Sequence, residues 1–158
     1  MNSEFVIAQA SLENEVASVR ELFREYAAGL RIDLCFQNFS SELAALPGLY
    51  APPTGRLLLA SIAQSPAGCA ALRPLNANDC EMKRLYVRPQ FRRAGLGRKL
   101  TERIISEARQ IGFAKMKLDT LPSMTDAIEL YGSLGFYRCA KYYDAAPEHL
   151  VFMELKLQ

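Results

Sequence analysis

Residues 85–97 read LYVRPQFRRAGLG and connect a predicted strand to a predicted helix. The strand covers residues 80–87, and Arg88-Pro89 ends it because proline has no N–H to offer to a sheet. The helix covers residues 96–111, where Leu and Ile side chains recur every three or four positions and form one apolar face. A glycine-containing loop therefore leads directly into the N-terminus of an amphipathic helix.

Positive charge is concentrated around this loop. Residues 83–103 contain eight of the 19 basic residues and one acidic residue, which gives this segment a formal charge of +7. Because the whole chain carries +2, the other residues sum to −5. The N-terminus of a helix attracts anions through its free N–H groups and its dipole, so arginines beside it favour a phosphate-binding site over a solvated helix face. The negative remainder disfavours a protein that binds nucleic acid through a broad basic face.

Two common phosphate-binding motifs do not describe this loop well. A P-loop requires Gly-Lys-Ser/Thr, which the loop lacks. A dinucleotide fingerprint fits in part, since Gly95-x-Gly97 opens the helix and Asp119 ends the next predicted strand. However, Leu100 occupies the third glycine position, and seven residues separate Val87 from Gly95, whereas that motif turns directly from strand into helix.

The rest of the chain predicts a sheet with helices packed around it. Periodicity and turn residues place strands at 4–9, 56–63, 67–73, 80–87, 115–119, 136–142 and 148–157, and helices at 13–30, 40–46, 96–111 and 125–134. A turn at Ser65-Pro66 is expected to join the second and third strands. The order β-α-α-β-β-β-α-β-α-β-β contains one βαβ crossover. It predicts a mixed, mostly antiparallel α/β (α+β) sheet in a single domain covering residues 1–158.

Composition sets the broad class of the protein. The chain has 158 residues, of which 50% are apolar and 23% are charged, the balance of one soluble globular domain. The four cysteines form no CxxC pair and His149 is the only histidine, so we expect no metal site. The first residues lack a basic region followed by a long apolar run. We therefore expect no signal peptide, no membrane anchor and a cytoplasmic location.

Three motifs together resemble one enzyme superfamily. RRAGLG at 92–97 matches the pyrophosphate loop Q/R-x-x-G-x-G/A of the GNAT acetyltransferases, and LYVRP at 85–89 matches the strand ending that precedes this loop. AIELY at 127–131, followed by Gly135-Phe136, matches the superfamily's A-x-x-L-Y-x-x-x-G-F signature. The resemblance extends over essentially the whole chain and includes the order of the elements.

This resemblance implies an acetyl-CoA-dependent N-acetyltransferase that moves an acetyl group to a primary amine by direct attack in a ternary complex. It implies that the parallel strands 80–87 and 115–119 splay apart around the pantetheine arm, while the loop binds the pyrophosphate. The expected cofactor-binding residues are Leu85, Tyr86, Val87, Arg92, Arg93, Ala94, Gly95, Leu96, Gly97 and Arg98. The chain departs from the superfamily at Met124, where many members have an asparagine that binds the cofactor arm.

The resemblance also assigns two residues to proton transfer. Tyr131 matches the tyrosine near the sulfur and is the expected general acid for the leaving thiolate; the alternative is a core aromatic side chain. Glu81 matches a glutamate that acts as the base in some members, and strand alternation places it on the same face as Leu85 and Val87. The alternative for Glu81 is a polar residue at the edge of a strand.

The acceptor is expected between the first two helices and the last pair of strands. An aromatic wall of Phe36, Phe39, Tyr142 and Tyr143 is predicted there, although aromatic side chains near loops also serve as core or rim. Nothing in these segments selects among small-molecule and peptide amines, and no membrane partner is expected. Two other functions stay open, an acyl-CoA-binding sensor without turnover and a basic nucleic-acid-associated protein. A homodimer is compatible with the sequence, because edge strands of this superfamily often pair.

Overall fold

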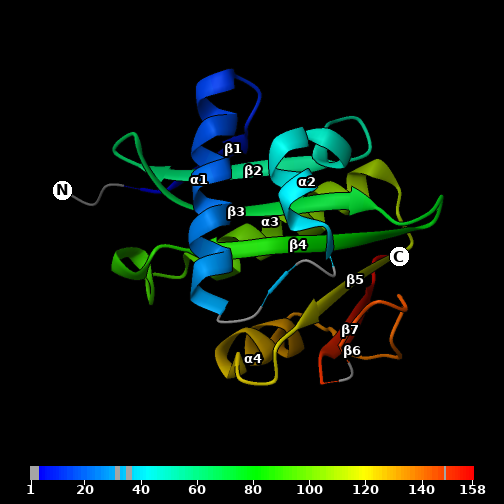
Figure 1. Cartoon of the computed structure of the whole chain (residues 1–158). Helices are drawn as coiled ribbons and strands as arrows, with labels where there is room; N and C mark the ends of the chain where they lie inside the picture. Colours follow the sequence, from blue (N-terminus) through cyan, green and yellow to red (C-terminus); the bar gives the residue numbers. More distant parts are fainter. Residues whose placement is uncertain (1–3, 31–32, 35–36, 148) are drawn as a thin grey trace.

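Seven strands form one sheet in the computed structural model, which describes residues 4–30, 33–34, 37–147 and 149–158 (Figure 1). The strands are β1 (Val6–Gln9), β2 (Arg56–Ile62), β3 (Ser65–Pro74), β4 (Asp79–Val87), β5 (Lys115–Thr120), β6 (Tyr137–Arg138) and β7 (Val151–Lys156). Their order across the sheet is β1-β2-β3-β4-β5-β7-β6, and β4 and β5 are the one parallel pair in it. The predicted mixed, mostly antiparallel α/β sheet is confirmed.

Helices cover both faces of this sheet (Figure 1). They are α1 (Glu13–Leu30), α2 (Phe39–Ala45), α3 (Leu96–Ile111) and α4 (Thr125–Ser133), with short 3-10 turns η2 (Gly48–Tyr50) and η3 (Pro89–Phe91). One core cluster lies between the sheet and α3 and α4, and a second lies between the sheet and α1. None of the helices in the described ranges combines the length and the apolar composition of a membrane-spanning segment.

The two long helices, α1 and α3, have the bounds that their apolar stripes predict. In α3, Leu96, Leu100 and Ile104 are at most 1% exposed, because the stripe faces the sheet. The helix ends at Gly112, whose φ of +106° is easy for glycine and lets its N–H bond the Ala108 carbonyl. The long connection between β4 and β5 is thereby a helix packed on one face, as a parallel crossover requires.

The hairpin between β2 and β3 turns at Ala63-Gln64, so the predicted turn at Ser65-Pro66 is wrong. Both residues of the real turn have positive φ, +48° and +67°, as in the two-residue type I′ turns whose twist suits a hairpin. Ser65 already pairs with Ile62, and Pro66 lies opposite Ser61, beside an irregularity in the ladder where a proline is tolerated. Serine and proline are common in turns, and here the same residues begin a strand.

The last two strands are shorter than the predicted 136–142 and 148–157. The chain leaves β6 after Arg138, and the rings of Tyr142 and Tyr143 pack edge-on against Phe152, with centroids 5.4 and 5.7 Å away. Aromatic packing replaces the strand pairing that alternation suggested. Glu148, at the predicted start of the final strand, lies outside the described residues.

The central parallel pair diverges after three residue pairs. β4 and β5 are in register at Asp79–Lys115, Cys80–Met116 and Glu81–Lys117, and no pairing follows although both strands continue. On its other side, β4 contains a bulge, where its register with β3 shifts between Cys69 and Ala71. The splay that the family resemblance implied is therefore present, and it opens the sheet at the centre of the molecule.

Candidate active site

The bulge in β4 decides which side chains face which side of the sheet. Arg84 has a φ of +59°, a left-handed conformation that is uncommon for an arginine and adds one residue to the strand. Before the bulge, Cys80 and Met82 pack into the core beneath α3; after it, Leu85 and Val87 do. Glu81 therefore lies on the opposite face from Leu85 and Val87, and the expectation that simple alternation gave for these three residues is wrong.

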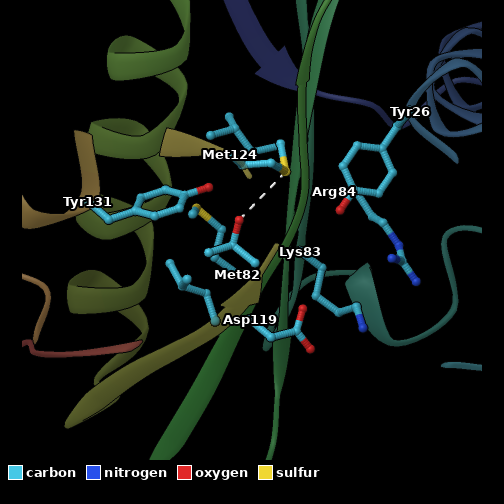
Figure 2. Close-up of a pocket in the computed structure, with 10 residues that line it drawn as sticks. Tyr26, Met82, Lys83, Arg84, Asp119, Met124 and Tyr131 are labelled. Atoms are coloured by element: carbon cyan, nitrogen blue, oxygen red, sulfur yellow. Dashed lines mark hydrogen bonds between the residues drawn. The ribbon is translucent and has the colours of Figure 1, made fainter. Parts of the chain in front are cut away.

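A small slot lies where β4 and β5 separate, with a volume of about 20 Å³. Figure 2 shows Met82, Met124 and Tyr131 on one side of β4 and Lys83, Arg84 and Tyr26 on the other. The remaining lining residues are Leu85, Leu118, Asp119 and Thr120. The slot thus reaches through the sheet from the α4 side to the α1 side.

Tyr131 extends from α4 into this slot. Its ring packs against Phe136 with centroids 5.6 Å apart, and the residue is 6% exposed. Its hydroxyl forms no hydrogen bond to any other described residue, and Figure 2 shows it directed toward the middle of the cavity. Burial raises the pKa of this phenol above its ordinary value, so the hydroxyl keeps its proton at neutral pH. The geometry supplies a protonated donor with no partner among the residues that the structure describes.

A groove of about 820 Å³ shares Tyr26, Leu85 and Met124 with the slot and extends along β4 to the start of α3. Eight of the ten predicted cofactor-binding residues line it: Leu85, Tyr86, Val87, Arg92, Arg93, Gly95, Leu96 and Gly97. Ala94 and Arg98 do not line it. The opposite wall comes from the segment 121–130, which contains the start of α4.

The first turn of α3 suits a diphosphate. No acidic residue lies in that turn, and Lys99 is the first residue in it whose N–H bonds back to a preceding carbonyl, that of Gly95. A Cβ atom on Gly95 would meet nothing within 4 Å, and one on Gly97 would just touch Leu130 and Val87 at 4.0 Å. The free amides therefore lie at an open concave surface, the geometry in which helix N-termini bind phosphate groups.

The three candidate arginines differ in their availability. Arg92 donates to the Val87 carbonyl at 2.8 Å and lies over the Tyr86 ring. Arg98 turns toward α4, where it donates to Ser133 at 2.7 Å. Arg93 forms no hydrogen bond or ion pair in the part of the chain that the structure describes, and it lines the groove. Arg93 is therefore the side chain most available for a phosphate.

Met124, the departure from the superfamily pattern, lies where the cavities meet. It immediately precedes α4 and lines the slot, the groove and a third cavity of about 20 Å³. Its sulfur accepts a weak hydrogen bond from the Thr120 hydroxyl at 3.6 Å. An asparagine here would offer a polar group to the cofactor arm, whereas methionine offers an apolar wall.

Glu81 is buried among polar partners outside all three cavities. It is 1% exposed, accepts from Arg73 at 2.8 Å, and accepts from the Tyr142 hydroxyl at 2.5 Å. Burial and the adjacent Glu81 charge raise the pKa of Tyr142, so this phenol stays a hydrogen-bond donor. Both oxygens of Glu81 are thus engaged by other side chains.

The predicted aromatic wall is only partly assembled at the site. Phe39 and Tyr142 line none of the three cavities. The Arg84 guanidinium instead lies over the Phe39 ring, with its Cζ atom 5.0 Å from the ring centroid. Tyr143 touches the site through its hydroxyl, which donates to Asp119. Phe36 lies outside the described residues.

Asp119 was missed as a site residue by the sequence reasoning, which considered it only as part of a dinucleotide fingerprint. It lies in β5 after β4 and β5 have separated, and it lines both the slot and the third cavity. It accepts hydrogen bonds from Tyr143 and from Gln37. An acidic residue at the end of the strand parallel to β4 was the signal that could have identified it.

Lys83 and Arg84 were also counted only as part of the basic segment, yet both lie at the slot. Arg84 makes a bidentate pair with Glu42 at 2.8 and 3.0 Å. Burial lowers the pKa of Lys83, since a buried ammonium loses its hydration. Among the described residues, no three His, Cys, Asp or Glu side chains come together as metal ligands.

Comparison with known proteins gives one consistent family. The model of the acetyltransferase (GNAT) family matches residues 16–136. An uncharacterised N-acetyltransferase of Schizosaccharomyces pombe is 37% identical, over 98% of this chain and 96% of that protein. An IAA acetyltransferase of Azospirillum brasilense is 34% identical, over 96% of this chain and 97% of that protein.

Solved structures show the same fold. A GNAT-family acetyltransferase from Staphylococcus aureus superposes with a TM-score of 0.82 at 19% identity, over 98% of this chain and all of that one. A structure from Salmonella typhimurium that contains its cofactor acetyl-CoA superposes with a TM-score of 0.73 at 24% identity, over 99% of this chain and 95% of that one.

Proposed function

Because this chain belongs to the GNAT acetyltransferase family, and is therefore an acyltransferase that uses an acyl-CoA, we propose that it transfers acetyl from acetyl-CoA to a primary amine by direct attack in a ternary complex. The observation that carries this proposal is the connection of the groove to the slot. The free amides of α3 lie at one end of the groove, and the slot that adjoins its other end holds the hydroxyl of Tyr131, which has no partner among the described residues. A long donor with a diphosphate at one end and a thioester at the other matches that arrangement.

The main chain of β4 is the proposed partner of the pantetheine arm. Beyond Glu81, β4 no longer pairs with β5, so the edge of β4 at Leu85, Tyr86 and Val87 is open to a ligand. An N–H aimed at the thioester oxygen from this edge would stabilise the charge that develops there, an effect of about 3 kcal/mol for one well-placed donor. The resulting pose puts the sulfur beside Tyr131.

Tyr131 is the proposed general acid. Its hydroxyl lies in the slot, has no partner within the described residues and keeps its proton because its pKa is raised. As the N–C bond forms and the C–S bond breaks, the thiolate takes the proton of this phenol. A group that is protonated at neutral pH and unengaged is suited to that step.

Asp119 is the proposed base. An alkylammonium is mostly protonated at neutral pH and must lose a proton before it attacks. Asp119 lines the slot, whereas Glu81 lines none of the three cavities described above and accepts from Arg73 and Tyr142. Of the two protons that the ammonium loses in the reaction, one leaves through Asp119 to solvent and the other restores the phenol of Tyr131, whose own proton has gone to the sulfur. In this proposal Glu81 positions the loop that carries Tyr142, and proton removal by Glu81 is the competing hypothesis.

Titration calorimetry with coenzyme A, followed by a thiol-release assay with acetyl-CoA and a panel of amines, tests the function. Gly97→Asp puts a carboxylate at the diphosphate site, where a Cβ atom has room, and is expected to abolish coenzyme A binding. Gly132→Asp is the matched control, because a Cβ atom there meets nothing within 4 Å and the residue lines none of the cavities. Binding without thiol release would leave an acyl-CoA-binding module, and no binding would refute the proposal.

A further inference from the structure

The carboxamide of Gln37 lies between two groups of opposite charge on the α1 side of the slot. Its oxygen accepts from Arg84 at 2.7 Å and from the Lys83 ammonium at 3.2 Å. Its nitrogen donates to Asp119 at 3.3 Å and to the Tyr143 hydroxyl at 3.2 Å. The carboxamide oxygen thus accepts from two cationic side chains, and the carboxamide nitrogen donates to a carboxylate.

The two cations at this position are not equally satisfied. Arg84 has its bidentate partner in Glu42, and its side chain is 2% exposed. Lys83 is 7% exposed, and the carboxylate oxygen with which it forms an ion contact, Oε1 of Glu81, is 3.9 Å away. That same oxygen already accepts from Arg73 at 2.8 Å. A buried ammonium with one hydrogen bond within the described residues and one distant counter-charge can bind a further anion.

The carboxylate and the ammonium face one cavity. Lys83 and Asp119 both line the slot, and Figure 2 shows the carboxylate of Asp119 directed toward the side of β4 on which Lys83 lies, opposite Tyr131. They form no ion pair with each other in the portion of the chain that the structure describes. The site therefore presents a positive and a negative group to one cavity, and the uncharged side chain of Gln37 bridges them.

Resting on the proposed function, we propose that the acceptor is a free α-amino acid, with its carboxylate bound by Lys83 and its amine by Asp119 in the place that the Gln37 carboxamide now holds. In the carboxamide the oxygen and the nitrogen are separated by one carbon, and in an α-amino acid the carboxylate oxygen and the amine nitrogen are separated by two carbons. The ligand therefore offers the same pair of an acceptor and a donor, with one carbon more between them. Its zwitterion also leaves the charge of the site unchanged.

This arrangement distinguishes the acceptor from other amines. A polyamine or an aminoglycoside brings positive charge alone, which Lys83 would repel. A peptide N-terminus brings an amine next to an amide, which leaves Lys83 without an anion. Sites built around a charged or hydrogen-bonded group discriminate strongly against analogues that lack it, because their own buried groups are then left unpaired.

The first experiment uses the wild-type protein and thiol release from acetyl-CoA. Each of the proteinogenic α-amino acids is assayed beside a polyamine, an aminoglycoside and a short peptide. The best amino acid is then compared with its amide and with the amine that lacks the carboxyl group altogether. We expect kcat/KM to fall about a hundredfold or more for the amide and for the amine. Equal use of the three compounds, or preference for the polyamine, aminoglycoside or peptide, would overturn the inference while leaving the acetyltransferase function intact.

The second experiment assigns the discrimination to Lys83. In Lys83→Met, kcat/KM for the amino acid is expected to fall to about the value for its amide. The loss is expected mainly as a higher KM for the amino acid. Lys115→Met is the matched control on the same sheet, since Lys115 lies in β5 outside the three cavities. A Lys83→Met protein that kept the full preference would refute the role of Lys83. Absence of thiol release with every amine, despite coenzyme A binding, would count against the proposed function itself.

Discussion

The hydroxyl of Tyr142 donates a hydrogen bond to the carboxylate of Glu81 across a distance of 2.5 Å. The next residue, Tyr143, does the same for Asp119. Two adjacent tyrosines of the loop between β6 and β7 thus hold one carboxylate on each strand of the parallel pair. The two carboxylates differ in one respect, since Asp119 faces the slot and Glu81 does not.

Asp119→Asn and Glu81→Gln form a matched pair of substitutions that separates the base from the positioning residue. Asp119→Asn is expected to lower kcat/KM about a hundredfold, because the amide cannot take up the proton of the ammonium. Glu81→Gln is expected to leave kcat/KM within about threefold of wild type and to lower stability by about 2 kcal/mol, because the ion pair of the buried Glu81 with the partly exposed Arg73 loses its charge. Steady-state kinetics and urea unfolding measure the two effects. The reverse pattern would make Glu81 the base.

Tyr131→Phe removes the proposed proton donor and keeps the ring. Because the ring packs against Phe136, the fold should persist, while kcat is expected to fall about a hundredfold with little change in KM for acetyl-CoA. Tyr137→Phe is the control, since that hydroxyl is exposed and bonds Glu154 on β7. A Tyr131→Phe enzyme within about twofold of wild type in thiol release would exclude proton donation by this residue.

The ion pair between Glu25 of α1 and Arg88 after β4 predicts a pH dependence of stability. The hydrogen bond from Arg88 lowers the pKa of Glu25 below its ordinary value of 4.5. The stabilisation is therefore complete above that value and is lost as the pH falls through the lowered folded-state pKa. We expect Glu25→Gln to cost about 0.5–1 kcal/mol at pH 7, given partial exposure of both groups, and nothing below the lowered pKa.

Thermal unfolding at a series of pH values checks this expectation. Glu129→Gln on α4 is the control, because Glu129 is exposed and forms no ion pair in the segments that the structure describes. A difference between wild type and Glu25→Gln that stayed constant down to strongly acidic pH would show that the ion pair contributes no stability.

The size of the slot predicts preference for a short acyl group. A volume of about 20 Å³ holds little more than one water molecule, and Met82, Leu118 and Met124 are among its walls. Butanoyl-CoA is expected to react at least about tenfold more slowly than acetyl-CoA, since each added methylene must displace a wall. Met124→Ala is expected to reduce the difference in rate between acetyl-CoA and butanoyl-CoA, because it removes part of one wall of the slot. Equal rates of the two donors with wild-type protein would contradict the prediction.

Much of the fold was predictable because its signals are local. The helices at 13–30 and 96–111 carry long apolar stripes, and a glycine that can adopt positive φ ends the second of them. The helical crossover between the strands at 80–87 and 115–119 implied a parallel pair. The groove was predictable for the same reason, as its glycines and arginines are contiguous in the chain.

The rest depends on contacts between distant segments. The bulge at Arg84 needs a positive φ at a non-glycine residue, which the Glu42 pair and the Phe39 ring stabilise from another helix. Counting alternate residues along β4 from Glu81 therefore assigns the side chains beyond Arg84 to the wrong face of the sheet. Gln37 and Asp119 are 82 positions apart, so nothing local indicates that they bond.

The bulge also constrains how this protein can change. Flattening the bulge while keeping every residue, with Arg84 in an ordinary extended conformation, would shift the alternation and rotate Leu85 and Val87 out of the core beneath α3 and toward α1. An insertion of one residue after Arg84 would have the same effect, and either change would expose apolar side chains on the wrong wall of the slot. Evolution can therefore replace the residue at position 84 only by one whose backbone takes the same left-handed conformation.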